Sequence, residues 1–263
     1  MGGLEVINVS KYYKERLVLD RIDISTYNKE FIGIIGQSGA GKSTLLRIIA
    51  GLEVPDAGFI RIDGEKVKGP TQYVGYLFQD YRLFPWLTVK ENVFFPIDNS
   101  GLKKATAYSL YERALYYMEI LGLTEKCNNY PHELSGGLKQ RVALCRSLSL
   151  HPKILLLDEP SSALDMFTAI KSWILLRKLY EEIDTTFIVV SHNLDEVAFL
   201  CDRVIVLDSH PGRVLADIRI DQYKSKQDEI VDVNYLFSSG HTRIKKIISD
   251  MLFKNGSPNH NTT

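Results

Sequence analysis

Residues 36–44 read Gly36-Gln37-Ser38-Gly39-Ala40-Gly41-Lys42-Ser43-Thr44 and fit the pattern GxxxxGK(S/T). An apolar run at residues 31–35 precedes them, as expected of a strand that is covered on both faces. A helical pattern follows at residues 42–50, with Gly51 placed as its stop. A strand, a glycine-rich loop and a helix in this order form the context that the pattern requires. The segment therefore predicts an anion-binding loop between a buried strand and a helix.

The residue types in this loop match the chemistry of a bound phosphate chain. Glycines let the loop curl so that backbone N–H groups point inward, and the helix N-terminus adds its dipole. Lys42 supplies a point charge between the terminal phosphates, the Ser43 hydroxyl is a magnesium ligand, and Thr44 is expected to contact a phosphate. A glycine-rich turn that only caps the helix is the alternative interpretation. The residues expected to bind the nucleotide here are Gly36, Ser38, Gly39, Ala40, Gly41, Lys42, Ser43 and Thr44.

A second apolar strand ends in two acidic residues. Residues 154–157 are all apolar, and Asp158 and Glu159 follow directly. A parallel strand that ends beside the loop would bring both carboxylates to the magnesium, which Asp158 would hold through water. Glu159 lies one residue further and is the expected catalytic base that deprotonates the attacking water. Without the loop, such a pair would more often be the solvated end of a strand.

The order of strand and helix patterns predicts an α/β fold. Short β-rich runs occupy residues 4–35, and from residue 153 onward apolar strands alternate with helical stretches, which predicts βα units and a mostly parallel sheet. Between about residues 88 and 150 the period is helical, which indicates an inserted helical lobe. The apolar stripe of this lobe consists of Leu110, Ala114, Leu115, Met118 and Leu121.

The last part of the sequence is more polar than the rest. Residues 221–263 contain a short amphipathic pattern around 244–252 and end in a tail rich in Asn, His, Thr, Pro and Gly, which we expect to be disordered. We therefore expect one domain at residues 1–220 and a C-terminal extension at residues 221–263.

Composition excludes several classes of protein. The 263 residues include 32 Lys plus Arg and 32 Asp plus Glu, so the net charge is zero and nucleic acid is not an expected partner. The three cysteines are scattered and are expected to be reduced packing residues. No basic stretch with a following apolar run starts the sequence, and no run approaches the ~20 apolar residues needed to cross a bilayer. We therefore expect a cytosolic chain that reaches a membrane only through a partner.

Residues 134–141, Leu-Ser-Gly-Gly-Leu-Lys-Gln-Arg, resemble the signature motif of ABC ATPases. The resemblance extends from about residue 4 to residue 214, with the motifs in the family's order. It implies a P-loop NTPase core with a mostly parallel sheet, an N-terminal antiparallel β subdomain and an inserted α-helical subdomain. The motifs are Tyr13, the loop at 36–44, Gln79, the signature, Asp158-Glu159, the segment 162–165 and His192.

The signature has a physical interpretation as a second anion-binding helix end. Ser135-Gly136-Gly137 opens a predicted helix, so a hydroxyl and N–H groups face outward there. In the family this end contacts ATP that the opposite subunit holds, which implies a two-fold dimer with shared sites. A plain helix cap after a turn is the alternative. The sequence departs from the family at Leu138, where Gln is common, and we expect slower or equal turnover rather than a dead site.

Four further residues gain roles only through the resemblance. Tyr13 resembles the aromatic residue that stacks on adenine, with Tyr12 as the competing neighbour. Gln79 resembles the glutamine that contacts magnesium and acts as a hinge for the helical lobe. His192 resembles the histidine that hydrogen-bonds the γ-phosphate and holds the base and water in place. Asp165 resembles the aspartate that communicates across the dimer, although an N-cap is an equally good local explanation.

The resemblance implies the ATP-hydrolysing subunit of a transporter, with ATP and Mg2+ as cofactors. Residues 130–133 and 209–213 are similar to importers of the nitrate, sulfonate and taurine group. Residues 84–88 are expected to form part of a groove for a short permease helix, with hydrophobic core residues as an equally good interpretation. The implied partners are a second copy of the chain, membrane permease subunits and, indirectly, an extracytoplasmic solute-binding protein. The implied location is peripheral, on the cytoplasmic face of the inner membrane. An exporter or lipoprotein-release ATPase, a non-transport ABC ATPase and a scaffold without turnover are the alternatives.

Overall fold

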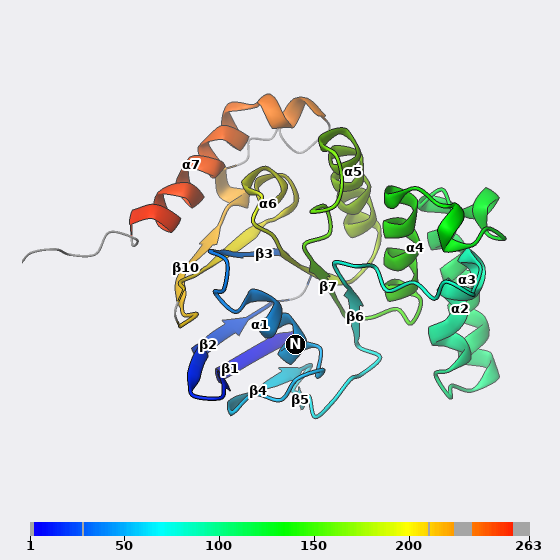
Figure 1. Ribbon diagram of the computed structural model, residues 1–263, viewed down its shortest axis with the longest axis horizontal. Coiled ribbons are helices and arrows are strands. Elements are labelled where there is room, and N and C mark those ends of the chain that lie inside the picture. The colour runs from blue at the N-terminus through cyan, green and yellow to red at the C-terminus, as the bar shows by residue number, and fades with distance from the viewer. Residues whose placement is uncertain (1–2, 28, 210, 224–232, 255–263) are drawn as a thin grey trace, which may run out of the picture. The chain divides into compact units, whose positions relative to one another are not determined.

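The computed structural model describes residues 3–27, 29–209, 211–223 and 233–254, and the chain forms two compact units (Figure 1). The first unit combines residues 1–69 with residues 189–263, and the second consists of residues 70–188. The glycine-rich loop and His192 belong to the first unit, whereas Gln79, the signature and the Asp158-Glu159 pair belong to the second.

The first unit contains the N-terminal antiparallel sheet. Its strands are β1 (Leu4–Tyr13), β2 (Arg16–Ser25), β4 (Ala57–Ile62) and β5 (Glu65–Lys66), in the order β2-β1-β4-β5. The turn between β1 and β2 pairs Tyr13 with Arg16, and Lys14 adopts a φ of 57° there. At Gly58, where φ is 76°, a Cβ would lie 2.3 Å from the carbonyl oxygen of Asn8, so only glycine fits at this irregular point of the sheet.

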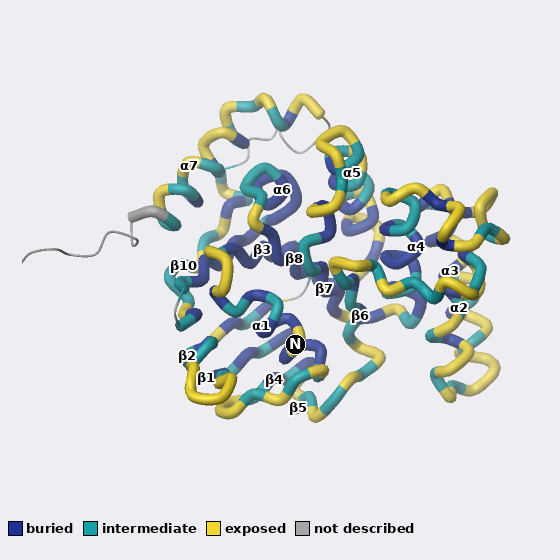
Figure 2. Tube along the Cα trace, in the orientation of Figure 1, coloured by how far each residue is buried: buried dark blue, intermediate teal, exposed yellow. Residues whose placement is uncertain are grey.

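A second set of strands in the first unit supports the glycine-rich loop. β3 (Phe31–Gly36) runs parallel to β9 (Arg203–Leu207), and β10 (Val214–Arg219) pairs antiparallel with β9. All of β9 and residues 31–35 of β3 are buried, which confirms the continuous apolar patterns (Figure 2). Helices α1 (Lys42–Ile49) and α6 (Leu194–Leu200) contact β3.

The C-terminal part of the first unit packs on α6. It consists of the short 3-10 helices η3 (Asp221–Tyr223) and η5 (Val233–Phe237) and of α7 (Ser239–Lys254), which is longer than the amphipathic pattern at 244–252. Ile244 and Ile248 are fully buried, which confirms the apolar face of that pattern. The predicted disorder of residues 255–263, and His210 of the importer-like segment, lie outside the described residues.

The second unit contains a parallel pair of strands and the predicted helices. β6 (Val74–Leu77) runs parallel to β7 (Ile154–Asp158). The other neighbour of β7 is β8 (Thr186–Val190), whose last two residues belong to the first unit. The region between about 88 and 150 is helical as predicted, although a separate helical subdomain and the boundary at 220 stay predictions. Its elements are α2 (Val89–Asp98), α3 (Lys104–Ile120), η1 (Thr124–Lys126), η2 (Pro131–Glu133) and α4 (Gly136–Leu148), and α5 (Met166–Glu182) follows β7.

One member of the predicted apolar stripe was wrong. Leu115 is 49% exposed, whereas Leu110, Ala114, Met118 and Leu121 are buried. The buried face of α3 follows the spacing of Leu110, Ala114, Tyr117 and Met118, and Leu115 points about 100° away from Ala114, on the side outside that face. Among the described residues, we find no helix with the length and apolar character that a membrane span requires.

Candidate functional site

The glycine-rich loop connects β3 to α1 in the conformation that the motif requires. Gly39 and Gly41 have φ values of 81° and 82°, in the left-handed region. A Cβ on Gly41 would also lie 2.6 Å from Cδ2 of Leu19, so a larger residue would be both strained and crowded. Gly41 is the N-cap of α1, and in this fully described segment no side chain caps the helix and its first turn contains no acidic residue. The helix N-terminus is therefore suited to an external anion.

Lys42 is held across the start of the loop. Its Nζ donates to the carbonyl oxygens of Gly36 at 2.8 Å and Gln37 at 3.0 Å, and the residue is 8% exposed. These bonds place an ammonium group beside backbone N–H groups at the start of a helix. A polyphosphate fits this donor set, because each of its members attracts negative charge.

Of the two candidate tyrosines, Tyr13 is linked to this helix. The Nη2 of Arg47, on α1, lies 3.4 Å from the Tyr13 hydroxyl and 3.4 Å from Oγ1 of Thr44. Tyr12 instead donates its backbone N–H to Asp56 at 2.6 Å. This side-chain contact with α1 favours Tyr13 as the candidate, and its stacking on adenine stays a prediction.

His192 is exposed and lies in a short segment that is fixed to β3. The backbone N–H of Ser191 donates to the carbonyl of Ile34 at 3.3 Å, two residues before the loop begins. The Ser191 hydroxyl donates to Oε2 of Glu196 at 2.6 Å and accepts from the backbone N–H of Asn193 at 3.0 Å. Residues on both sides of His192 are therefore anchored while its side chain reaches the surface.

In the second unit, Gln79 and Glu159 lie together after β6 and β7. The Gln79 amide donates to Oε2 of Glu159 and to Oγ of Ser162, each at 3.3 Å. Glu159 has a φ of 48°, which is uncommon for a residue other than glycine and is often found at functional sites. Asp158 ends β7 and accepts from the Tyr76 hydroxyl at 3.0 Å.

The signature forms a helix start, as predicted. Ser135 is the N-cap of α4, its Oγ accepts from the backbone N–H of Leu138 at 3.4 Å, and Ser135 and Gly136 are exposed. A Cβ on Gly137 would lie 3.1 Å from Cγ2 of Thr168, so space is limited there.

Asp165 is an N-cap, as the local interpretation predicted. It caps α5 by accepting from the backbone N–H of Thr168 at 3.0 Å and from its hydroxyl at 2.6 Å. The Thr168 hydroxyl, followed by its backbone N–H, lowers the pKa of Asp165. Capping of α5 does not test whether Asp165 makes a contact across a dimer, so that contact stays a prediction.

Three polar residues that hold these segments were not predicted from the sequence. Gln140 is buried, donates to the carbonyl of Pro160 at 2.8 Å and accepts from Ser172 at 2.9 Å. Asn92 is also buried, and Tyr76 hydrogen-bonds Asp158. The only signal for Gln140 and Asn92 was a polar side chain among apolar helix positions.

Comparisons with known proteins identify the family. Residues 19–162 match the family model described as ABC transporter. The nitrate import ATP-binding protein NrtD of Synechocystis sp. (strain ATCC 27184 / PCC 6803 / Kazusa) is 39% identical over 222 residues, which cover 83% of this chain and 82% of that protein. The aliphatic sulfonates import ATP-binding protein SsuB 1 of Xanthomonas axonopodis pv. citri (strain 306) is 42% identical over 220 residues, covering 84% and 86%.

Solved structures agree with this relationship. The dimeric structure of a post-hydrolysis state of the ATP-binding cassette MJ0796 bound to ADP and Pi superimposes with a TM-score of 0.69 at 33% identity, and covers 82% of this chain and 98% of that one. The fold is therefore that of an ABC ATPase cassette, with an antiparallel N-terminal sheet and a parallel-rich sheet. This chain belongs to the ABC transporter family, as one of its ATP-binding subunits, which are ATPases coupled to transport.

Proposed function

We propose that the chain binds and hydrolyses MgATP as a two-fold dimer and so drives the import of a small solute through a separate permease. The observation that carries this proposal is the phosphate-binding loop, in which Lys42 is held beside the uncapped start of α1. Backbone N–H groups, an ammonium and the helix dipole together favour a polyphosphate.

Hard oxygen donors suit magnesium in this proposal. Ser43, Gln79 and Asp158 offer a hydroxyl, an amide and a carboxylate, and Mg2+ is usually held by one or two such groups together with substrate phosphates. Bound magnesium would neutralise charge on the terminal phosphates. Tyr76 keeps the Asp158 carboxylate in place through its hydrogen bond.

Glu159 is the proposed base. It accepts the proton of the attacking water, and the Gln79 amide orients its carboxylate. It has a left-handed backbone and follows directly after β7, which Asp158 ends. His192, fixed on both sides, is proposed to hold the terminal phosphate and the water in line.

The exposed start of α4 supports a shared site. Ser135, Gly136 and Gly137 form a helix N-terminus whose first turn contains no acidic residue. We assign it to the nucleotide of a second copy, with Asp165 near the same contact. The solved relative named above is a dimer, which is consistent with this assignment.

A cavity in the second unit supports docking of a permease. It measures about 480 Å³ and is lined in part by Tyr76, Phe78, Phe84 and Phe95, with Arg82 and Arg146 beside them. The ring centroids of Phe84 and Phe95 lie 4.4 Å apart, and Trp86 next to them is 71% exposed. Aromatic and arginine side chains are typical of protein interfaces, so a short permease helix suits this surface. It would keep the chain peripheral, at the cytoplasmic face of the inner membrane.

The choice of solute rests only on the names of the similar proteins. NrtD and SsuB 1 are named for nitrate and aliphatic sulfonates. We therefore propose nitrate, a sulfonate, taurine or a similar small solute, delivered by an extracytoplasmic solute-binding protein. Purification of the assembled transporter and uptake of each solute into vesicles tests this choice.

The test of the ATPase uses Glu159→Gln and Lys42→Ala. Glu159→Gln should bind MgATP but hydrolyse it about 10²- to 10⁴-fold more slowly, and should accumulate as an ATP-bound dimer. Lys42→Ala should weaken nucleotide binding itself. Glu119→Gln, an exposed acid on α3, is the control and should keep full activity. A fully active Glu159→Gln, or unchanged ATP affinity of Lys42→Ala, would contradict the assignment.

A further inference from the structure

The end of β1 is fastened to the segment 53–56 by three consecutive residues. The Nζ of Lys11 donates to the carbonyl of Val54 at 2.8 Å, the backbone N–H of Tyr12 donates to Asp56 at 2.6 Å, and the hydroxyl of Tyr13 donates to Oε1 of Glu53. Consecutive strand residues normally face opposite sides. Attachment of all three to one segment therefore restricts the position of the strand end, including Tyr13.

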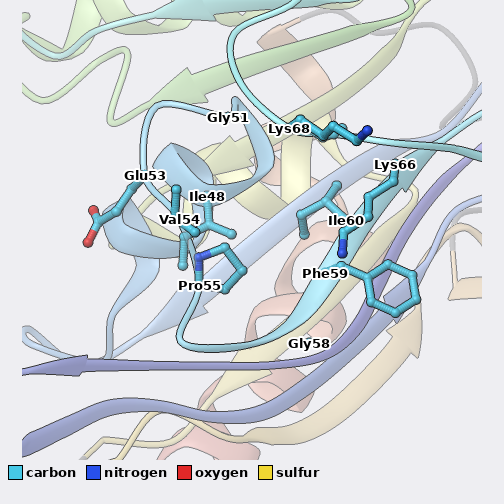
Figure 3. A pocket seen from close by; sticks show the side chains of 11 residues that line it. Ile48, Gly51, Glu53, Val54, Pro55, Gly58, Phe59, Ile60, Lys66 and Lys68 are labelled. Atoms are coloured by element: carbon cyan, nitrogen blue, oxygen red, sulfur yellow. The ribbon is translucent and has the colours of Figure 1, made fainter.

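Glu53 is itself fixed to α1 by main chain and side chain. Its backbone N–H donates to the carbonyl of Arg47 at 3.2 Å, and its Oε2 accepts from the Nε of Arg47 at 3.2 Å. Figure 3 shows Ile48, Val54 and Pro55 at a cavity of about 310 Å³, while the Glu53 carboxylate points away from them. The Glu53 carboxylate is thus directed away from the cavity and contacts Tyr13.

The charges around Glu53 favour the same arrangement. Lys11 Nζ lies 3.7 Å from Oε1 of Glu53 and 5.7 Å from the ring centroid of Tyr13. The side chains of Lys11 and Glu53 are only 13% and 18% exposed, so solvent screens this contact less than a surface pair. The ammonium of Lys11, the guanidinium of Arg47 and the hydroxyl of Tyr13 therefore all contact the Glu53 carboxylate.

Arg47 connects this cluster to the phosphate end of the site. The guanidinium that binds Glu53 also lies 3.4 Å from the Tyr13 hydroxyl and 3.4 Å from the hydroxyl of Thr44. Thr44 follows directly after Ser43 in the phosphate-binding loop. The position of Tyr13 is therefore fixed relative to α1, the helix that starts at the loop.

We propose that Glu53 is a positioning residue for nucleotide binding, which holds the Tyr13 ring ready to stack on adenine. This inference rests on the proposed function, in which Tyr13 contacts the base. Tyr13 is 42% exposed, so the residue is accessible to a ligand while its hydroxyl is anchored. An immobilised ring loses less conformational freedom on binding, and its release should weaken MgATP binding about three- to tenfold.

The experiment compares two ligands on the full chain, MgATP and magnesium tripolyphosphate, by isothermal titration. Tripolyphosphate has no base, so only MgATP reports on Tyr13. Glu53→Ala and Tyr13→Phe should each weaken MgATP binding about three- to tenfold and leave tripolyphosphate binding unchanged. The double variant should lose little more than either single one, because both remove the same contact. Glu53→Gln, which keeps an acceptor oxygen, should recover part of the affinity.

The controls separate this inference from the proposed function. Glu65→Gln, an exposed acid in the same sheet, should bind both ligands normally. Equal losses for MgATP and tripolyphosphate in Glu53→Ala, or no loss for either, would overturn the positioning role. Unchanged MgATP affinity in Tyr13→Ala would instead refute the adenine contact itself. If Glu53→Ala does not fold, Tyr13→Phe tests the same hydrogen bond from the other side.

Discussion

Replacement of Asn92 by leucine should release the segment 84–88, which forms part of the proposed permease-docking surface. Asn92 lies in α2 with no exposed surface. Its Oδ1 accepts from the backbone N–H of Phe84 at 2.8 Å, and its Nδ2 donates to the carbonyls of Phe84, Leu87 and Thr88 at 3.1, 3.0 and 3.0 Å. One side chain thus ties both ends of the segment to the helix.

The size of the effect follows from these contacts. The carbonyls of Thr88 and Phe84 keep main-chain bonds from the N–H groups of residues 92 and 87, so two contacts are lost in full, those of the Phe84 N–H and the Leu87 carbonyl. Each contributes about 0.5–1.5 kcal/mol net, which predicts a local loss of about 1–3 kcal/mol. Since about 1.4 kcal/mol corresponds to a factor of ten, the amide of Phe84 should exchange with solvent about 5- to 140-fold faster.

Hydrogen exchange followed by mass spectrometry measures this change. Asn99→Leu is a matched control, because Asn99 is exposed and makes one side-chain bond, to the carbonyl of Phe95 at 2.9 Å. It should alter exchange of the segment 84–88 by less than a few fold, since it makes no contact there. Unchanged exchange at Phe84 in Asn92→Leu would refute the reasoning, because the segment would then be held by other contacts.

Three further predictions concern other parts of the chain. Gly75→Ala places a Cβ 2.3 Å from the carbonyl oxygen of Ser147, so urea denaturation should show a loss of about 1–3 kcal/mol, and an unchanged midpoint would contradict the crowding. Burial raises the pKa of the Cys145 thiol, so iodoacetamide should label half-buried Cys127 in the folded protein and Cys145 only after unfolding. The backbone N–H and then the hydroxyl of the N-cap threonine lower the pKa of Glu91 below its usual 4.5. The wild type should therefore have a higher thermal midpoint than Glu91→Gln above about pH 4.5. This difference should disappear as the pH falls through the lowered pKa of Glu91 in the folded protein, and a pH-independent difference would refute the prediction.

Local patterns predicted the parts of the fold that depend on neighbours in sequence. The run at residues 31–35 became the buried strand β3, and the pattern at 42–50 became α1 with Gly41 as its N-cap. Ser135 and Asp165 became N-caps for the same reason, since a cap is decided within four residues. Leu115 was wrong because an apolar residue type does not show that its position lies within the buried face, which runs through Leu110, Ala114 and Met118 and leaves Leu115 outside.

Contacts between distant residues were not predictable from the sequence. Nothing local distinguishes Glu53 from an ordinary surface acid, because its partners Tyr13 and Arg47 come from β1 and α1. Asn92 and Gln140 are polar residues within helical patterns, and only the folded chain shows which carbonyls they bind. The roles proposed for Gln79 and His192 likewise came from the family resemblance, not from a physical pattern.

These missed residues share one physical task. Segments that contact nucleotide or permease must stay exposed, so apolar burial cannot hold them, and a polar side chain from a neighbouring helix or loop does so instead. Glu53 holds Tyr13, Asn92 holds Phe84, and Gln140 binds the carbonyl that follows Glu159. Each makes several hydrogen bonds from one side chain, so its loss frees a whole segment while the apolar core stays intact. Substitutions at these three positions should therefore impair binding or turnover before they lower global stability.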